Sequence, residues 1–134
     1  MVKLVSGWLS GGSNMMPWIF VFLTVAFTVY GQIVVKWQVG QMGELPDGLM
    51  DKVIFVFSQY LNPWIMSGLA SAFLASACWI VAMTRLDLSV AYPFMSLAFV
   101  IVLFLSAVFF SEALSINKAI GTVIILVGLF VIIR

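Results

Sequence analysis

The chain contains no histidine, and Cys78 is the only cysteine among its 134 residues. A lone thiol cannot form an intrachain disulfide, and a chain without histidine lacks the ligand clusters that zinc and other transition metals need. The same shortage removes the nucleophile and base pairs on which Cys/His catalysis depends. We therefore expect no metal, no cofactor and no enzymatic activity of the chain itself.

Charged residues are also scarce, at 8% of the chain, and the formal net charge is only +1. A protein with so little positive charge does not attract the phosphate backbone of a nucleic acid strongly. Nucleic acid is therefore not an expected partner. The acidic residues all fall in connections or at the ends of apolar segments: Glu44, Asp47, Asp51, Asp87 and Glu112. No carboxylate is therefore expected at mid-membrane depth.

Hydrophobic residues are abundant, at 64% of the chain. They form four apolar stretches, which run from Pro17 to Val39, Pro63 to Thr84, Ser89 to Phe110 and Lys118 to Ile132. A helix needs about 20 residues to cross the hydrocarbon core of a bilayer. The first three stretches reach that length, and we take the shorter fourth stretch as a marginal span. We predict an all-α integral membrane protein with four transmembrane helices.

Two segments lie outside these stretches. Residues 1–16 are expected to be a flexible N-terminal tail, with Met15 or Met16 as alternative native starts, and residues 17–134 to be the transmembrane domain. Between the first two stretches, Asp51, Lys52, Ser58 and Gln59 recur on one face of an otherwise apolar segment from Leu49 to Leu61. This pattern predicts a short amphipathic helix in the membrane interface, either as a plain connector or as a gate for substrate.

Proline and small polar residues predict where the helices begin. Pro17 fits the first turn of the first helix, where its missing N–H is not needed. Asn62 is a candidate N-cap directly before Pro63, and Asp87 or Ser89 is a candidate cap for the third helix.

Four polar side chains in the first stretch, Thr24, Thr28, Gln32 and Lys36, are spaced four residues apart. Residues at this spacing lie nearly above one another on a helix and so form a polar stripe. The threonines alternatively bond the preceding turn of their own helix, and Lys36 alternatively extends to the headgroups. In an internal cleft, the Lys36 ammonium would attract a phosphate or a carboxylate. The stripe is our main candidate for substrate binding.

The third stretch supplies a second group of candidates. Tyr92 and Ser96 share a helix face, and Pro93 between them is expected to kink the helix and free a carbonyl group. A tightly packed kink with an interfacial tyrosine is the alternative. Trp79 in the second stretch is a further candidate for the cavity, although tryptophans at such positions commonly belong to the interfacial aromatic belt.

Small residues predict where helices pack. Gly68, Ala72, Ala75 and Ser76 favour close approach along the second helix, and Gly121 and Gly128 do so along the fourth. The two glycines of the fourth helix serve either dimerisation or packing within the chain. Because four short helices enclose little volume, we expect a homodimer or a heterodimer with a similar small subunit. The even distribution of lysine and arginine between the two ends permits an antiparallel pair.

Three segments are similar to motifs of the small four-helix members of the drug/metabolite transporter superfamily, over about Trp18 to Ile133. Gly31-Gln32-Ile33-Val34-Val35-Lys36 resembles the first-helix motif, and Ser89-Val90-Ala91-Tyr92-Pro93-Phe94-Met95-Ser96-Leu97 resembles the third-helix motif. Glu112, followed by Gly121 to Gly128, resembles the closing helix.

Two subfamilies of that group are considered. Small multidrug-resistance exporters carry a proton-exchanging glutamate three residues before the motif glycine, where this chain has Thr28. The chain instead resembles flippase subunits for undecaprenyl phosphate-aminoarabinose, which share Gly31-Gln32, Lys36 and Ala91-Tyr92-Pro93 and also lack the glutamate.

That resemblance implies a multi-pass protein of the bacterial inner membrane that moves a lipid-linked sugar. Lys36 would meet the phosphate, and Thr24, Thr28, Gln32, Tyr92 and Ser96 would meet the glycan. Two alternatives stay open: an exporter of small amphiphilic cations, and a non-transporting membrane subunit of a glycosyltransferase system.

Overall fold

A computed structural model describes residues 15–133, and within them every regular element is a helix. The helices are α2 (Met16–Gln41), α3 (Leu49–Gln59), α4 (Pro63–Met83), α5 (Leu88–Phe94), α6 (Leu97–Phe110) and α7 (Ile116–Ile133). This confirms the all-α class. The expected N-terminal tail falls almost entirely outside the described residues.

Three of the expected spans are long and apolar enough to cross a membrane: Met16–Gln41, Pro63–Met83 and Leu88–Phe110, the last comprising α5 and α6. The fourth, Ile116–Ile132 within α7, is a shorter apolar helix. The structure therefore describes a helical protein with three strongly apolar helices of membrane length and one shorter companion.

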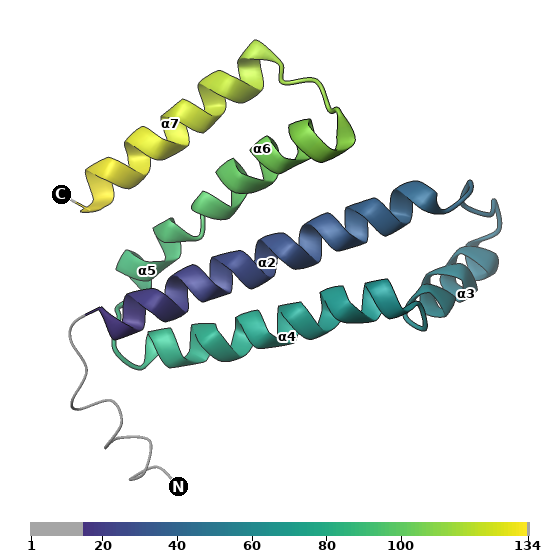
Figure 1. Cartoon of the computed structure of the whole chain (residues 1–134), viewed down its shortest axis with the longest axis horizontal. Helices are drawn as coiled ribbons and strands as arrows, with labels where there is room; N and C mark the ends of the chain where they lie inside the picture. The colour runs from purple at the N-terminus through teal and green to yellow at the C-terminus, as the bar shows by residue number, and fades with distance from the viewer. Residues whose placement is uncertain (1–14, 134) are drawn as a thin grey trace, which may run out of the picture.

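The helices form a layer in which α2 and α6 run in one direction and α4 and α7 run in the opposite direction (Figure 1). α2 lies between α4 on one side and α6 on the other, and α7 lies beyond α6. The short α3 sits at the end of the layer where α2 finishes and α4 begins. The most extensive contact in the chain is between α2 and α4, so these two helices form its structural base.

Glycines allow α2 and α4 to approach closely. A Cβ atom added to Gly31 of α2 would lie 3.1 Å from the carbonyl oxygen of Gly68 in α4. The prediction of small-residue packing is confirmed for Gly68 and Ala75, which are buried, and stays a prediction for Ala72 and Ser76, which are exposed in the single chain. The buried residues of α4 are Ile65, Gly68, Ser71, Ala75 and Ala82, which define the face turned to α2.

Two buried side-chain hydroxyl groups contact backbone carbonyl oxygens across the α2–α4 interface. Ser71 Oγ donates to the Phe27 carbonyl oxygen at 2.6 Å. Thr24 Oγ1 lies 2.8 Å from the Phe20 carbonyl oxygen of its own helix and 3.3 Å from the Ala75 carbonyl oxygen of α4. Because hydrocarbon offers no water to a polar group, hydroxyls at this depth are best placed between helices.

Helix starts follow the predicted signals in part. The Asn62 side chain accepts a hydrogen bond from the Trp64 N–H at 2.9 Å, which confirms the cap ahead of Pro63. Asp87 occupies the predicted N-cap position of α5. Its side chain makes no capping hydrogen bond, so the predicted side-chain cap is wrong.

The third apolar stretch is interrupted at Met95 and Ser96, which begin two residues after Pro93. Proline has no N–H to donate to the preceding turn, so one bond of the regular ladder is lost at Pro93. The backbone instead uses tighter bonds, from Met95 N–H to Tyr92 and from Ser96 N–H to Pro93. α5 and α6 are therefore two pieces of one membrane-length segment.

Candidate functional site

A cavity of about 650 Å³ lies between α2, α3, α4 and the connection that joins α2 to α3. Its lining is mainly apolar, and its side-chain polar groups come from Thr28, Gln32, Gln59 and Tyr60. None of the described residues that line it is charged. A volume of this size suits a small organic ligand or part of a larger one. The cavity can therefore hold apolar groups and offers a few hydrogen bonds to orient them.

Thr28 and Gln32 of the predicted polar stripe line this cavity. Gln32 is exposed, so its amide is available to a molecule that enters. The other two members of the stripe lie elsewhere. Thr24 is 4% exposed and lies in the α2–α4 interface, with both of its hydroxyl contacts made to backbone carbonyls.

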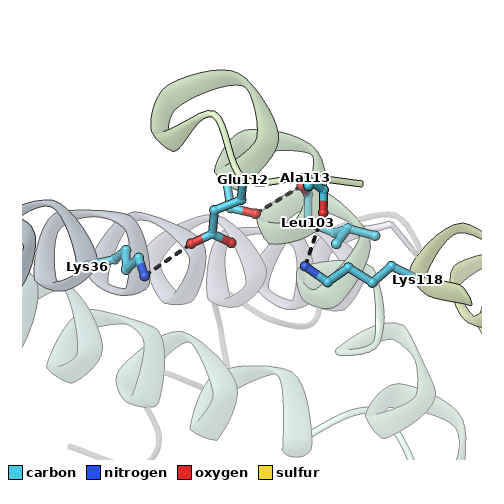
Figure 2. Close-up of polar contacts among 6 residues, drawn as sticks. Lys36, Leu103, Glu112, Ala113 and Lys118 are labelled. Carbon is cyan, nitrogen blue, oxygen red and sulfur yellow. Dashed lines mark hydrogen bonds and ion pairs between the residues drawn. The ribbon is translucent and has the colours of Figure 1, made fainter. Parts of the chain in front are cut away.

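Lys36, the last member of the stripe, faces the connection between α6 and α7. Its Nζ lies 3.1 Å from Oε1 of Glu112, and Figure 2 shows the two side chains pointing toward each other. Their side chains are 57% and 38% exposed, so the ion pair is accessible in this chain.

The geometry of an α-helix explains why the stripe divides. With 3.6 residues per turn, each step of four residues rotates the position by about 40° around the axis. From Thr24 to Lys36 this adds up to about 120°. The stripe therefore starts against α4, passes the cavity at Thr28 and Gln32, and ends toward the α6–α7 connection.

The α6–α7 connection is held in place from several helices. Lys118 Nζ of α7 donates to the Ala113 carbonyl oxygen at 3.3 Å, and the Glu112 N–H donates to the Ser106 carbonyl oxygen of α6 at 3.4 Å (Figure 2). Ser111 has φ 53°, in the left-handed region that non-glycine residues seldom adopt. This turn directs the chain back toward α2, where Glu112 meets Lys36.

The charge of Glu112 follows from these neighbours. The hydrogen bond from Lys36, together with the positive charges of Lys36 and Lys118, lowers the pKa of the Glu112 carboxyl group below its ordinary value. Glu112 is therefore a carboxylate at neutral pH.

The remaining candidates gather at the other end of the layer. The Trp79 and Tyr92 rings meet edge to face with centroids 6.2 Å apart, and Ser96 lies at the start of α6. Tyr92 is 64% exposed. Ala75 lies beside Thr24, and Trp79 is one helical turn further from Lys36. Since Thr24 and Lys36 are separated by 12 residues, or roughly 18 Å of helix, the aromatic pair and Lys36 belong to opposite ends of the chain.

The chain matches the EamA-like transporter family over residues 17–134, nearly its whole length. This chain belongs to that family. Among curated proteins, it is 36% identical to a probable 4-amino-4-deoxy-L-arabinose-phosphoundecaprenol flippase subunit, ArnF, of Shewanella sediminis, over 80% of each chain. It is 30% identical to the protein of the same name from Photorhabdus laumondii, over 90% of this chain and 98% of that one.

A second kind of subunit is also similar. The probable flippase subunit ArnE of Pseudomonas savastanoi is 26% identical over 86% of this chain and 95% of that protein. No solved structure matches this chain significantly. The family assignment confirms the resemblance on which the sequence interpretation relied.

The sequence interpretation of this EamA-like protein missed two parts of the site. The sequence indicates Glu112 only as a feature of the closing helix, whereas the structure pairs it with Lys36. The sequence favours this segment as a connector or a gate but does not assign Phe55 and Gln59 of α3, or the following Tyr60, to a cavity. The scarcity of acidic residues was a usable signal for Glu112, because few carboxylates are available to a lysine in this chain.

The glycines of α7 are open within this chain. A Cβ added to Gly121 or Gly128 would meet nothing within 4 Å. Neither glycine therefore packs closely against another part of residues 15–133, and their role in dimerisation stays a prediction.

Proposed function

We propose that this EamA-like protein is a subunit of a flippase that moves undecaprenyl-phosphate 4-amino-4-deoxy-L-arabinose, or a closely similar lipid-linked aminosugar, across the bacterial inner membrane. The observation that carries this proposal is similarity along most of the chain to several proteins named as subunits of such a flippase. The geometry of α2 supplies physical support.

The substrate combines an anionic phosphate, a polar sugar and a long apolar tail. Lys36 is the candidate contact for the phosphate, since an ammonium group at a helix end in the membrane attracts phosphate strongly. Thr28 and Gln32, which line the cavity, are candidates for the sugar hydroxyls. The apolar tail would remain in lipid or against the apolar walls of the cavity.

The other predicted site residues lie away from the cavity and are proposed to act elsewhere on the transport path. Tyr92, Ser96 and Trp79 would meet the sugar at the other end of the path, and the break after Pro93 would let α5 and α6 move relative to each other. Thr24 is the weakest candidate, because its hydroxyl already contacts two carbonyl oxygens.

A second subunit is part of the proposal, with α7 as a fourth membrane span and α3 in the interface. Large apolar side chains of α6 and α7 are widely exposed in the single chain, among them Phe99, Phe104, Ile124 and Phe130. A similar small subunit or another copy of this chain would cover part of that surface, with Gly121 and Gly128 permitting close approach.

The cation-exporter alternative loses support from the cavity. Its lining contains no carboxylate to bind or exchange for a cation, since Thr28 stands at the position where the exporters carry glutamate. The non-transporting alternative requires the polar groups of α2 to be paired with helices. Thr24 meets that requirement, whereas Gln32 faces the cavity.

The test uses inverted membrane vesicles from cells that produce the protein, so that any natural partner is present. A membrane-impermeant amine-reactive reagent reports which fraction of the lipid-linked aminosugar lies on the outer face. We expect the parent to change this fraction over time, Lys36→Gln to abolish the change, and Lys52→Gln, which alters a lysine of α3, to behave as the parent. Transport by Lys36→Gln at the parental rate would refute the phosphate contact.

A further inference from the structure

The Lys36–Glu112 ion pair is the feature that the proposed function does not yet explain. It joins two elements that are distant in sequence, α2 and the α6–α7 connection, and its nitrogen and oxygen atoms lie 3.1 Å apart. A lysine that binds the phosphate of the substrate must first be free of its own carboxylate. Glu112 therefore has to be part of any account of substrate binding at Lys36.

A simple anion would bind Lys36 unfavourably if it had to displace the Glu112 carboxylate. The anion would take Lys36 and leave the Glu112 carboxylate beside a second negative charge, without its partner. Lys118 is the other cation at this connection, and its Nζ contacts the Ala113 carbonyl oxygen. The Ser106 side chain, the nearby polar group of α6, bonds the Leu103 carbonyl oxygen and carries no charge.

A headgroup that carries both charges avoids this cost. We propose that Lys36 and Glu112 form a split site for a zwitterionic headgroup, in which the lipid phosphate pairs with Lys36 while the sugar ammonium group pairs with Glu112. Glu112 is thereby a specificity-determining residue that selects an aminosugar over a neutral sugar. This inference rests on the proposed function, because it assumes a phosphate at Lys36.

Charge balance and access both favour this exchange. One internal ion pair opens, and two pairs between protein and ligand replace it, so no charge is left alone at the membrane surface. Both side chains are substantially exposed, so the pair can open without disrupting a packed core. The two groups belong to different elements, and the α6–α7 connection can move away from α2 to admit a headgroup.

The protonation state of Glu112 is suitable for this role. Lys36 from α2 and Lys118 from α7 are the charged groups that face it, and both lower its pKa. Glu112 is therefore a carboxylate at neutral pH, where an amine of ordinary basicity is protonated. An ammonium group arriving beside it would take over the stabilisation that Lys36 provides.

The experiment measures selectivity between two lipids that differ only in one charge. The purified full chain, in mixed detergent and phosphatidylcholine micelles, is titrated with undecaprenyl-phosphate 4-amino-4-deoxy-arabinose and with its N-formyl derivative. Formylation removes the positive charge and keeps the phosphate, the sugar ring and the tail. The ratio of the two dissociation constants isolates the contribution of the ammonium group.

We expect the parent to bind the amino form roughly two- to fivefold more tightly, the range typical of an accessible ion pair. In Glu112→Gln the ratio should fall to about one, with the N-formyl lipid bound at least as tightly as by the parent. That retained binding also shows that the variant is folded. Glu44→Gln, which removes an exposed carboxylate of the α2–α3 connection, should keep the parental ratio.

Three results would overturn the inference: equal binding of both lipids by the parent, an unchanged ratio in Glu112→Gln, or the same loss of selectivity in Glu44→Gln. Failure of the proposed function looks different, since the parent would then bind neither lipid or Lys36→Gln would bind both as tightly as the parent does. Weakened binding of both lipids by Lys36→Gln, with the expected behaviour of Glu112→Gln, supports both ideas.

Discussion

The close contact between α2 and α4 makes a sharp prediction about adding one methyl group. In Gly31→Ala the new Cβ would lie 3.1 Å from the Gly68 carbonyl oxygen, so the backbone of α4 would have to shift by a few tenths of an ångström. Overfilling a packed interface costs about 1–3 kcal/mol, whereas replacing glycine by alanine within a helix gains up to about 1 kcal/mol. We expect a net loss of about 1 kcal/mol in the free energy of unfolding.

A matched control is available in the same helix. A Cβ added to Gly40 of α2 would meet nothing within 4 Å, so Gly40→Ala should show only the helix gain, up to about 1 kcal/mol. Reversible unfolding in mixed micelles by SDS, followed by circular dichroism, gives the difference between the two variants. We expect about 2 kcal/mol between them. Equal stability of Gly31→Ala and Gly40→Ala would show that α2 and α4 are not in such close contact.

Two further predictions follow from other polar contacts. Ser71→Ala removes the hydroxyl that donates to the Phe27 carbonyl oxygen, and should cost about 0.6–1.7 kcal/mol in the same unfolding assay. The cost should exceed that of Ser67→Ala, because the Tyr30–Ser67 contact between the same two helices is exposed; an equal cost would show that burial of the Ser71 hydrogen bond adds no stability. Glu112 should titrate below its ordinary value of 4.5 when followed by NMR of isotope-labelled glutamate, because the hydrogen bond and charge of Lys36 favour the carboxylate. The ion pair should therefore contribute to stability above about pH 4.5 and lose that contribution as the pH falls through the lowered pKa of Glu112. Lys36→Gln should raise the titration midpoint of Glu112, and an unchanged titration midpoint would mean that the pair does not form.

Local signals in the sequence were sufficient for the helices and for part of their packing. The Asn62-Pro63 pair marks the start of α4 because a side-chain cap and a proline both belong at that point of a helix. Gly68 and Ala75 indicate the face of α4 that meets α2 because only small residues permit such an approach. The amphipathic pattern of residues 49–61 likewise identified α3, which covers Leu49–Gln59.

The arrangement of the site depended on information that is not local. A spacing of four residues suggests a single stripe, but its rotation of about 40° per step carries Thr24 into the α2–α4 interface and Lys36 toward the α6–α7 connection. The meeting of Lys36 with Glu112 depends on how the α6–α7 connection turns back toward α2, which involves the left-handed backbone of Ser111. Neither feature follows from residue periodicity alone.

The central claim is that Lys36 holds the phosphate of a polyprenyl-linked sugar. Native mass spectrometry of the protein, purified from bacterial membranes, tests it most directly by identifying the lipids that remain bound. We predict that a polyprenyl-phosphate lipid co-purifies with the parent and with Lys52→Gln and is lost from Lys36→Gln, while ordinary phospholipid adducts persist in all three. Retention of the polyprenyl-phosphate lipid by Lys36→Gln at the parental level, or its absence from the parent, would contradict the claim.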